Sequence, residues 1–300
     1  MKNVVAKRRL NKRKVFFTRV SLIVLVILLV MTVKVSFQQR KIKTSSYLGN
    51  KVASSSKKHK ASSVKKNTVV LKNQISNDGT NAEDALKEDG KKTVYLTFDD
   101  GPSTTVTPKI LDILKANGVH ATFFLVGHAI EGSSKAADLV RRAYNEGNAI
   151  GDHTYSHDMK KLYRYNGRNV VDVDAFMNEV DRTQSIIKNI LGPTFFTRIV
   201  RMPGGHMSRV YYKDPNLPQL DSVFRQRNLV SVDWNAYDHD AEGRKEYSGE
   251  LFNHVKNEVG NHEKAIILMH DTYGKEETAK ALPNIIQYLK AQGYEFGTLK

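Results

Sequence analysis

The chain has 300 residues, of which 40% are hydrophobic, and it contains no cysteine, so disulfides, thiolate metal ligands and cysteine nucleophiles are excluded. Its net charge of +16 is unevenly placed: residues 1–92 hold 22 Lys+Arg and 5 Asp+Glu, whereas residues 93–300 hold 25 and 26. Because the C-terminal part is close to neutral, the composition argues against a nucleic-acid groove there, and no nucleic-acid partner is expected.

The N-terminus has the pattern of a membrane anchor. Residues 1–19 form a basic tail with eight Lys+Arg and no acid, and fourteen uncharged residues follow from Val20 to Val33. This pattern predicts one transmembrane signal anchor over residues 20–36, with the tail cytoplasmic and the remainder extracellular, as in a single-pass protein of the cell membrane. A cleaved signal peptide is the alternative, because its apolar core spans about 7–15 residues, although the residues after Val33 form a poor cleavage site.

The next segment, residues 37–92, is rich in Ser, Lys, Asn and Thr and poor in apolar residues. Such a composition cannot bury enough apolar surface to offset the entropy lost on ordering. The sequence therefore predicts a disordered basic linker between the membrane and a folded domain over residues 93–300.

The pattern from residue 93 onward alternates between strands and helices. We expect strands over 93–98, 120–126, 149–151, 195–200, 229–234, 265–269 and 294–298. We expect helices over 106–117, 134–146, 172–191, 219–227, 248–259 and 276–291. This alternation predicts an α/β fold with a parallel sheet, either a barrel or a doubly wound sheet. No Gly-rich phosphate loop is present, so a nucleotide cofactor has no visible docking site.

Polar side chains follow several of these strands. They are Asp99, Asp100, Asp152, His153, His157, Arg201, Asp238, Asp240, His270 and Asp271, and Gly204, with its bare backbone, follows one of the same strands. Because the carboxyl ends of parallel strands meet at one face, we expect these residues to build a single site.

Three of these residues form a candidate metal site. His153 and His157 are spaced to place both rings on one side of a helical turn, and Asp100 adds a carboxylate. Three protein ligands with open positions are typical of a catalytic metal, for which Zn²⁺ fits best and Co²⁺, Ni²⁺ or Mn²⁺ can substitute. The same set also suits non-haem iron, but the oxygenases that use it usually have jelly-roll-like sheets.

The remaining groups have the chemistry of proton transfer. Asp99, beside the metal, is a candidate general base, and Arg201 can pair with it and keep it ionised. His270 is a candidate acid for the leaving group, with Asp240 as the carboxylate that holds it cationic. Gly204 can present a bare backbone N–H to a developing oxyanion.

Four segments resemble successive motifs of the polysaccharide deacetylases, carbohydrate esterase family 4 with its NodB-homology domain. They are Thr97-Phe-Asp-Asp-Gly-Pro-Ser103, His153-Thr-Tyr-Ser-His157, Arg201-Met-Pro-Gly-Gly205 and Leu268-Met-His-Asp271. The match runs in order over roughly residues 91–299, and it extends to the peptidoglycan N-acetylglucosamine deacetylases of Gram-positive bacteria.

The resemblance implies a distorted (β/α)7-8 barrel that removes acetyl groups from N-acetylated sugars with a divalent metal. By position, it assigns the base to Asp99, the acid to His270 and the tether of the base to Arg201. It assigns the metal ligands to Asp100, His153 and His157. It also implies that Gly204 supplies the oxyanion N–H and that Leu268 lines the acetyl pocket.

The chain departs from the family in two motifs. The family often has Asp-x-x-Asp-Trp where this chain reads Val232-Asp-Trp-Asn-Ala-Tyr-Asp-His-Asp-Ala241. Matching the strand Trp to Trp234, a candidate substrate-binding residue, gives Asp240 as the support of His270 and puts Ala241 in place of the motif's Trp. A direct Asp-Trp match gives Asp233 instead. The third motif has Pro-Gly-Gly instead of the commoner Pro-Pro-Tyr, which removes an aromatic near the sugar.

The sequence as a whole predicts a membrane-tethered, metal-dependent deacetylase of cell-surface glycan, with N-acetylglucosamine of peptidoglycan as the expected substrate. Poly-N-acetylglucosamine, chitooligosaccharide and O-acetyl xylan are alternative substrates for the same chemistry. A non-catalytic wall-binding protein is the alternative of another class.

Overall fold

The computed structural model describes residues 79–163 and 170–300. The predicted tail (1–19), membrane anchor (20–36) and most of the predicted linker lie outside the described residues. Within the two described ranges, no helix is both long enough and apolar enough to span a bilayer.

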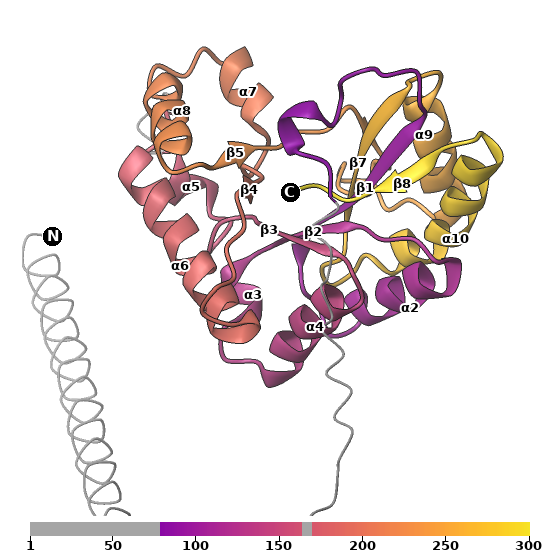
Figure 1. The fold of residues 1–300 in the computed structure, drawn as a ribbon, viewed down its shortest axis with the longest axis horizontal. Helices are drawn as coiled ribbons and strands as arrows, with labels where there is room; N and C mark the ends of the chain where they lie inside the picture. Colours follow the sequence, from indigo (N-terminus) through magenta and orange to yellow (C-terminus); the bar gives the residue numbers. More distant parts are fainter. Residues whose placement is uncertain (1–78, 164–169) are drawn as a thin grey trace, which may run out of the picture. The chain divides into compact units, whose positions relative to one another are not determined.

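The centre of the domain is an eight-stranded sheet in which every pairing is parallel (Figure 1). Its strands are β1 (Thr93–Gly101), β2 (Thr122–Leu125), β3 (Ala149–Asp152), β4 (Ile199–Val200), β5 (Val230–Ser231), β6 (Ala236–Tyr237), β7 (Lys264–His270) and β8 (Glu295–Gly297). The order is β5-β4-β3-β2-β1-β7-β6, and β8 pairs with the first residues of β1. No pairing among the described residues joins β5 to β6, so the sheet is an open half-barrel. The expected parallel α/β fold is therefore present, but the sheet does not close into the expected (β/α)7-8 barrel.

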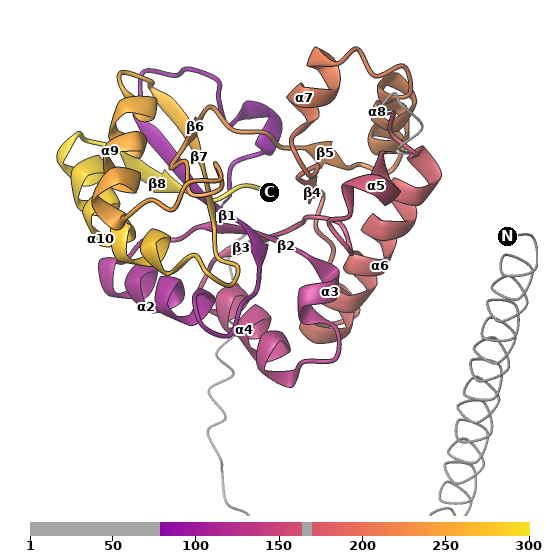
Figure 2. The ribbon, with the colours of Figure 1, turned by 180° about the vertical axis from the view of Figure 1, so that it is seen from behind.

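Helices cover the outside of these strands, as the two opposite views show (Figures 1 and 2). They are α2 (Thr107–Asn117), α3 (Gly127–Ile130), α4 (Ser134–Asn145), α5 (Met159–Leu162), α6 (Val173–Leu191), α7 (His206–Tyr211), α8 (Leu217–Gln226), α9 (Ser248–Val259) and α10 (Glu276–Ala291). The longer ones match the expected helices to within two residues. The sequence pattern missed α3, α5 and α7, which have only four to six residues each.

Alternation along β1 decides which side chains enter the half-barrel. Leu96 and Phe98 belong to the large core shared with the helices, whereas Tyr95 belongs to the cluster inside the sheet. By the same period of two, Thr97 and Asp99 point inward. β7 follows the same rule: Ile267 and Met269 join the helix-side core, so Leu268 and His270 point inward.

Two expected strands are much shorter than their apolar runs. In the 195–200 run only Ile199–Val200 is a strand, because the Gln184 side chain bonds both the carbonyl and the N–H of Thr197. In the 229–234 run only Val230–Ser231 is a strand, because the carbonyls of Val232 and Asp233 accept hydrogen bonds from Arg201. Side-chain hydrogen bonds thus replace strand pairing beside β4 and β5, which lie next to each other at one edge of the sheet.

Residues 79–92, which the sequence assigns to the linker, pack against the domain. Thr80 forms a parallel bridge with Leu299, and Ala85 is buried in the cluster inside the sheet. The short helix η1 (Ala82–Asp84) is joined to the domain by an ion pair between Glu83 and Arg198. The folded structure therefore begins before the expected boundary at residue 93.

Candidate active site

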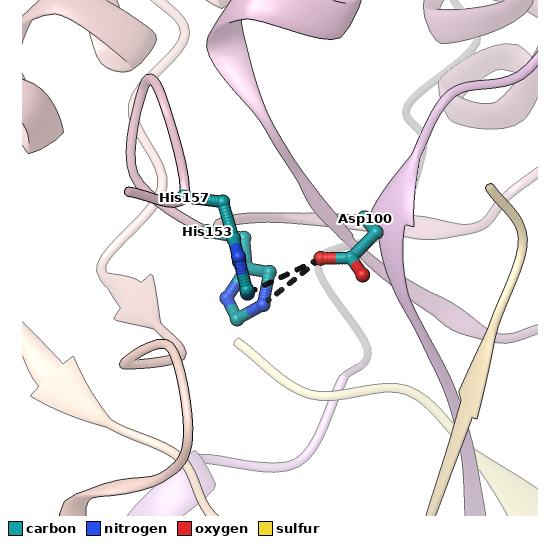
Figure 3. Close-up of side chains that lie close together, drawn as sticks. All are labelled: Asp100, His153 and His157. Carbon is teal, nitrogen blue, oxygen red and sulfur yellow. Dashed lines mark ion pairs between the residues drawn. The ribbon is translucent and has the colours of Figure 1, made fainter. Parts of the chain in front are cut away.

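Asp100, His153 and His157 come together at the carboxyl ends of β1 and β3 (Figure 3). The Asp100 Oδ1 atom lies 3.4 Å from the Nε2 atoms of both His153 and His157. One ligand atom from each of the three residues lies within 4.8 Å of the other two. The three residues that the sequence selects as metal ligands therefore share one candidate site.

The donor set fits a divalent cation. Asp100 Oδ1 is buried and has no hydrogen-bond partner within residues 79–163 and 170–300, although burying a polar atom unpaired is costly. Asp100 and His157 also have φ angles of +67° and +52°, a left-handed conformation that costs energy in residues with a Cβ. Two imidazoles and one carboxylate are the ligands that borderline metals such as zinc prefer.

His153 is held in the protonation state that a metal ligand needs. Its Nδ1 lies 2.7 Å from the carbonyl oxygen of Arg201, which can only accept, so Nδ1 carries the proton and the Nε2 lone pair faces Asp100. Burial, together with the charge of His157, lowers the pKa of His153 to about 3. The ring is therefore neutral at physiological pH.

Asp99 is the candidate base, and it lies next to this cluster. Its Oδ1 accepts a hydrogen bond of 2.8 Å from Arg201 Nη1, and its Oδ2 lies 3.6 Å from His153 Nε2. Burial raises the pKa of Asp99, and the Arg201 guanidinium opposes that rise. Arg201 itself is fully buried, and it also donates to Thr97 Oγ1 and lies over the Phe124 ring.

His270 is the candidate acid, and it faces Asp99 across the β1–β7 pairing, where the two residues are in register. Its Nδ1 lies 2.5 Å from Asp240 Oδ1, and its backbone N–H donates to Asp240 Oδ2. Burial alone would lower the pKa of His270, but the hydrogen bond and charge of Asp240 outweigh it and raise the pKa to about 9. His270 is therefore protonated at neutral pH, with Nδ1 committed to Asp240 and Nε2 free to donate.

The two candidate supports of His270 occupy different places. Asp240 contacts His270, whereas Asp233 accepts hydrogen bonds from the N–H groups of His206 and Met207 at the start of α7. Matching the family's strand Trp to Trp234, which gives Asp240, thus agrees with the geometry. Asp233 instead stabilises the N-terminus of a helix.

Gly204 lies in the turn between β4 and α7, with φ of +75°, a conformation that favours glycine. A Cβ built there would lie 3.3 Å from the Met159 Cε atom. Tyr163 stabilises this turn, because its hydroxyl donates to the Pro203 carbonyl at 2.8 Å.

The structure separates the remaining substrate-binding candidates. Leu268 points into the half-barrel and is buried, in register with Thr97. Trp234 lies against Gly205 instead, where a Cβ would approach its ring to 3.1 Å, and it lines a groove of about 570 Å³ beside Leu86. Ala241, at the place of the family Trp, lines a separate cavity of about 350 Å³ next to Asp240.

Supporting residues that the sequence did not reveal surround Asp240. Thr278 Oγ1 donates to Asp240 Oδ2 at 2.8 Å, and Lys275 Nζ donates to the Asp240 carbonyl at 2.5 Å. Lys275 directly precedes α10 and Thr278 lies in its first turn, and neither belongs to a recognisable motif. Only their position beyond the His270 strand could have marked them as candidates.

Comparisons with known proteins agree with this geometry. The polysaccharide deacetylase family model matches residues 86–216. A peptidoglycan-N-acetylglucosamine deacetylase of Bacillus cereus is 34% identical over 70% of this chain and 67% of its own length. A bifunctional xylanase/deacetylase of Pseudobutyrivibrio xylanivorans is 32% identical, and this chain matches 32% of its length. A CE4 esterase structure from Streptococcus mutans matches with a TM-score of 0.66 and 36% identity, covering 74% of this chain and 92% of that one.

The chain belongs to the polysaccharide deacetylase family. The family and the enzyme class predicted from the sequence are therefore confirmed. The half-barrel agrees with the Streptococcus mutans structure, and the family motifs supply the Asp-His-His cluster described above.

Proposed function

We propose that this enzyme removes N-acetyl groups from a cell-surface glycan in a metal-dependent hydrolysis, with N-acetylglucosamine of peptidoglycan as its substrate. The observation that carries the proposal is the arrangement at the mouth of the half-barrel. Asp99 lies beside the Asp-His-His cluster, and the protonated His270 is in register with it on the neighbouring strand.

Asp100, His153 and His157 would hold the divalent cation, and Zn²⁺ suits their donor atoms best, with Co²⁺, Ni²⁺ or Mn²⁺ as substitutes. When bound, such a cation supplies Lewis acidity that polarises an amide carbonyl and makes water a stronger acid. The Arg201 carbonyl accepts the His153 Nδ1 proton in a hydrogen bond, which fixes the tautomer and the orientation of this ligand.

The residues of the chain account for the proton transfers of amide hydrolysis. Asp99 accepts a proton from the attacking water as the new C–O bond forms, and Arg201 keeps the carboxylate oriented. The Gly204 N–H donates to the oxyanion. His270 then gives its Nε2 proton to the amine as the C–N bond breaks, while Asp240 stabilises the cationic ring beforehand.

The choice of substrate rests on the relatives and on the N-terminal sequence. The Bacillus cereus relative is named a peptidoglycan-N-acetylglucosamine deacetylase. A chain anchored by residues 20–36 would carry its domain outside the cell membrane, where peptidoglycan is the abundant N-acetylated polymer of a Gram-positive cell. The bifunctional xylanase/deacetylase relative makes O-acetyl xylan the second candidate substrate.

The test is to incubate the purified full chain with Zn²⁺ and, separately, with N-acetylated peptidoglycan fragments, chitooligosaccharides and O-acetyl xylan. Mass spectrometry then identifies which polymer loses acetyl and at which sugar. We expect loss of acetyl from the N-acetylglucosamine of peptidoglycan. Release from xylan alone would contradict the substrate, and release from no polymer would contradict the function.

A further inference from the structure

Two of the candidate metal ligands lie on one loop, residues 153–157, which follows β3. The carbonyls of Thr154 and Tyr155 in this loop accept hydrogen bonds from the first two backbone N–H groups of α3. His157 ends the loop with a φ of +52°, and such a conformation persists only where the surrounding contacts fix it. The contacts on either side of His157 therefore decide whether its ring stays where a cation needs it.

Glu179 on α6 supplies these contacts. Its Oε2 accepts a hydrogen bond of 2.7 Å from the Ser156 N–H, and its Oε1 and Oε2 lie 2.9 and 2.8 Å from Ser156 Oγ. The Ser156 hydroxyl donates its one proton to this carboxylate, and its oxygen accepts a hydrogen bond of 3.2 Å from the Asp158 N–H. Glu179 thus fixes the residue before His157 directly and the residue after it through the Ser156 hydroxyl.

The packing of α6 brings Glu179 within reach of the loop. Gly127, at the start of α3, lies between them: a Cβ built there would lie 2.6 Å from Thr183 Oγ1 and 2.9 Å from Tyr155 Cδ2. The Arg182 guanidinium carbon lies 3.4 Å from the centroid of the Tyr155 ring. Because Glu179, Arg182 and Thr183 are three and four positions apart, they share one face of α6. That face therefore contacts two successive residues of the loop.

We propose that Glu179 is a positioning residue for the metal site, because it holds both neighbours of His157 and so presets this ring beside Asp100 and His153. The inference rests on the proposed function, since it takes these three residues to hold a divalent cation. A loop that is already ordered loses less conformational entropy when the ion binds. Outer partners of metal ligands typically contribute about 10- to 100-fold to metal affinity, and we assign Glu179 an effect of this size.

Zinc binding tests the proposal without any turnover. The Kd of the full chain for Zn²⁺ is measured by competition with a chromophoric chelator. We expect it to rise about 10- to 100-fold in Glu179→Ala. The rise should be smaller in Glu179→Gln, because an amide oxygen can still accept the Ser156 N–H. Asp181→Asn, which alters an exposed pair with Arg227 on the same helix, is the control and should keep the wild-type Kd. An unchanged Kd in Glu179→Ala would overturn the proposal.

Thermal unfolding separates positioning from a general effect on the fold. The Tm of each variant is measured without metal and with a fixed concentration of Zn²⁺. Because stabilisation by a ligand follows its affinity, the rise in Tm that Zn²⁺ produces should be smaller in Glu179→Ala than in the wild type. If Glu179 only stabilised the fold, both Tm values would fall equally and the rise would stay the same, which would overturn the proposal. A wild type that binds no divalent cation would instead contradict the proposed function itself.

Discussion

His153 and His270 both lie at the mouth of the half-barrel, but the two sides of the site hold them in opposite proton states. On the β3 side, burial and a backbone carbonyl keep His153 neutral, with a pKa of about 3 and its Nε2 lone pair toward Asp100. On the β7 side, Asp240 raises the pKa of His270 to about 9 and keeps it cationic. The same residue type is therefore neutral, as our proposal requires of a metal ligand, where a carbonyl accepts from it, and cationic, as the proposal requires of an acid, where a carboxylate does.

The largest expected effect follows from removing one of the candidate metal ligands at the ends of β1 and β3. We expect Asp100→Ala or His157→Ala to lower acetate release about 10³-fold, because the bound cation contributes several kcal/mol to transition-state stabilisation. Metal content measured by mass spectrometry should fall with it. His120→Ala, an exposed histidine outside the site, is the control and should keep both. Full activity in either ligand variant would contradict the mechanism.

Arg201 contacts His153 through its carbonyl and Asp99 through its guanidinium, and its removal tests how far burial sets the charge of Asp99. Arg201→Met leaves a buried carboxylate without its partner, which should cost about 3–5 kcal/mol in the free energy of unfolding. The pKa of Asp99 should then rise further, because burial raises it and Arg201 opposes the rise, so the acid limb of the pH–rate profile should move to higher pH.

The matched control for Arg201 is Arg227→Met, which breaks an exposed pair with Asp181 and should cost at most about 1 kcal/mol. Urea denaturation measures both variants. Equal costs would show that the Arg201–Asp99 pair behaves as a surface pair.

On the β7 side, Asp240→Asn removes the charge that raises the pKa of His270. We expect about a 10²-fold loss of kcat/KM, and the alkaline limb of the pH profile should move from near pH 9 to lower pH, because the acid must be protonated. A raised pKa also means that the pair stabilises the fold fully below pH 6.5 and that this stabilisation is lost as pH rises through about 9. An unmoved alkaline limb would remove His270 from the role of acid.

The smallest effect on activity is expected at Asp233, the alternative candidate for the support of His270, which instead bonds the start of α7. Asp233→Ala removes the cap of α7 and should lower stability by about 1 kcal/mol without moving the alkaline limb. Thermal unfolding and the pH profile check this together. A shifted limb would show that the two aspartates had been assigned the wrong way round.

The candidate site could be predicted from the sequence where one short segment supplies two of its side chains. Asp99 and Asp100 leave one strand in succession, and His153 and His157 lie on one loop, so spacing alone brings them near each other. Thr278 was missed because its contact with Asp240 joins segments 38 residues apart.

The fold, like the site, could be predicted in part from the sequence. Long amphipathic helices and the buried strands β1 and β7 have periodic patterns that predict them well. Strands β4 and β5 were overestimated, because the apolar runs do not show that Gln184 and Arg201 take their backbone hydrogen bonds. The same side chains leave the β5 edge of the sheet short, and no periodicity distinguishes a closed barrel from a half-barrel.

The most direct test of the account is anomalous diffraction at the zinc absorption edge from crystals of the protein grown with Zn²⁺. We predict one strong peak about 2.0–2.2 Å from the Nε2 atoms of His153 and His157 and from a carboxylate oxygen of Asp100. An enzyme that releases acetate while its zinc is bound elsewhere, or while it binds none, would contradict the account.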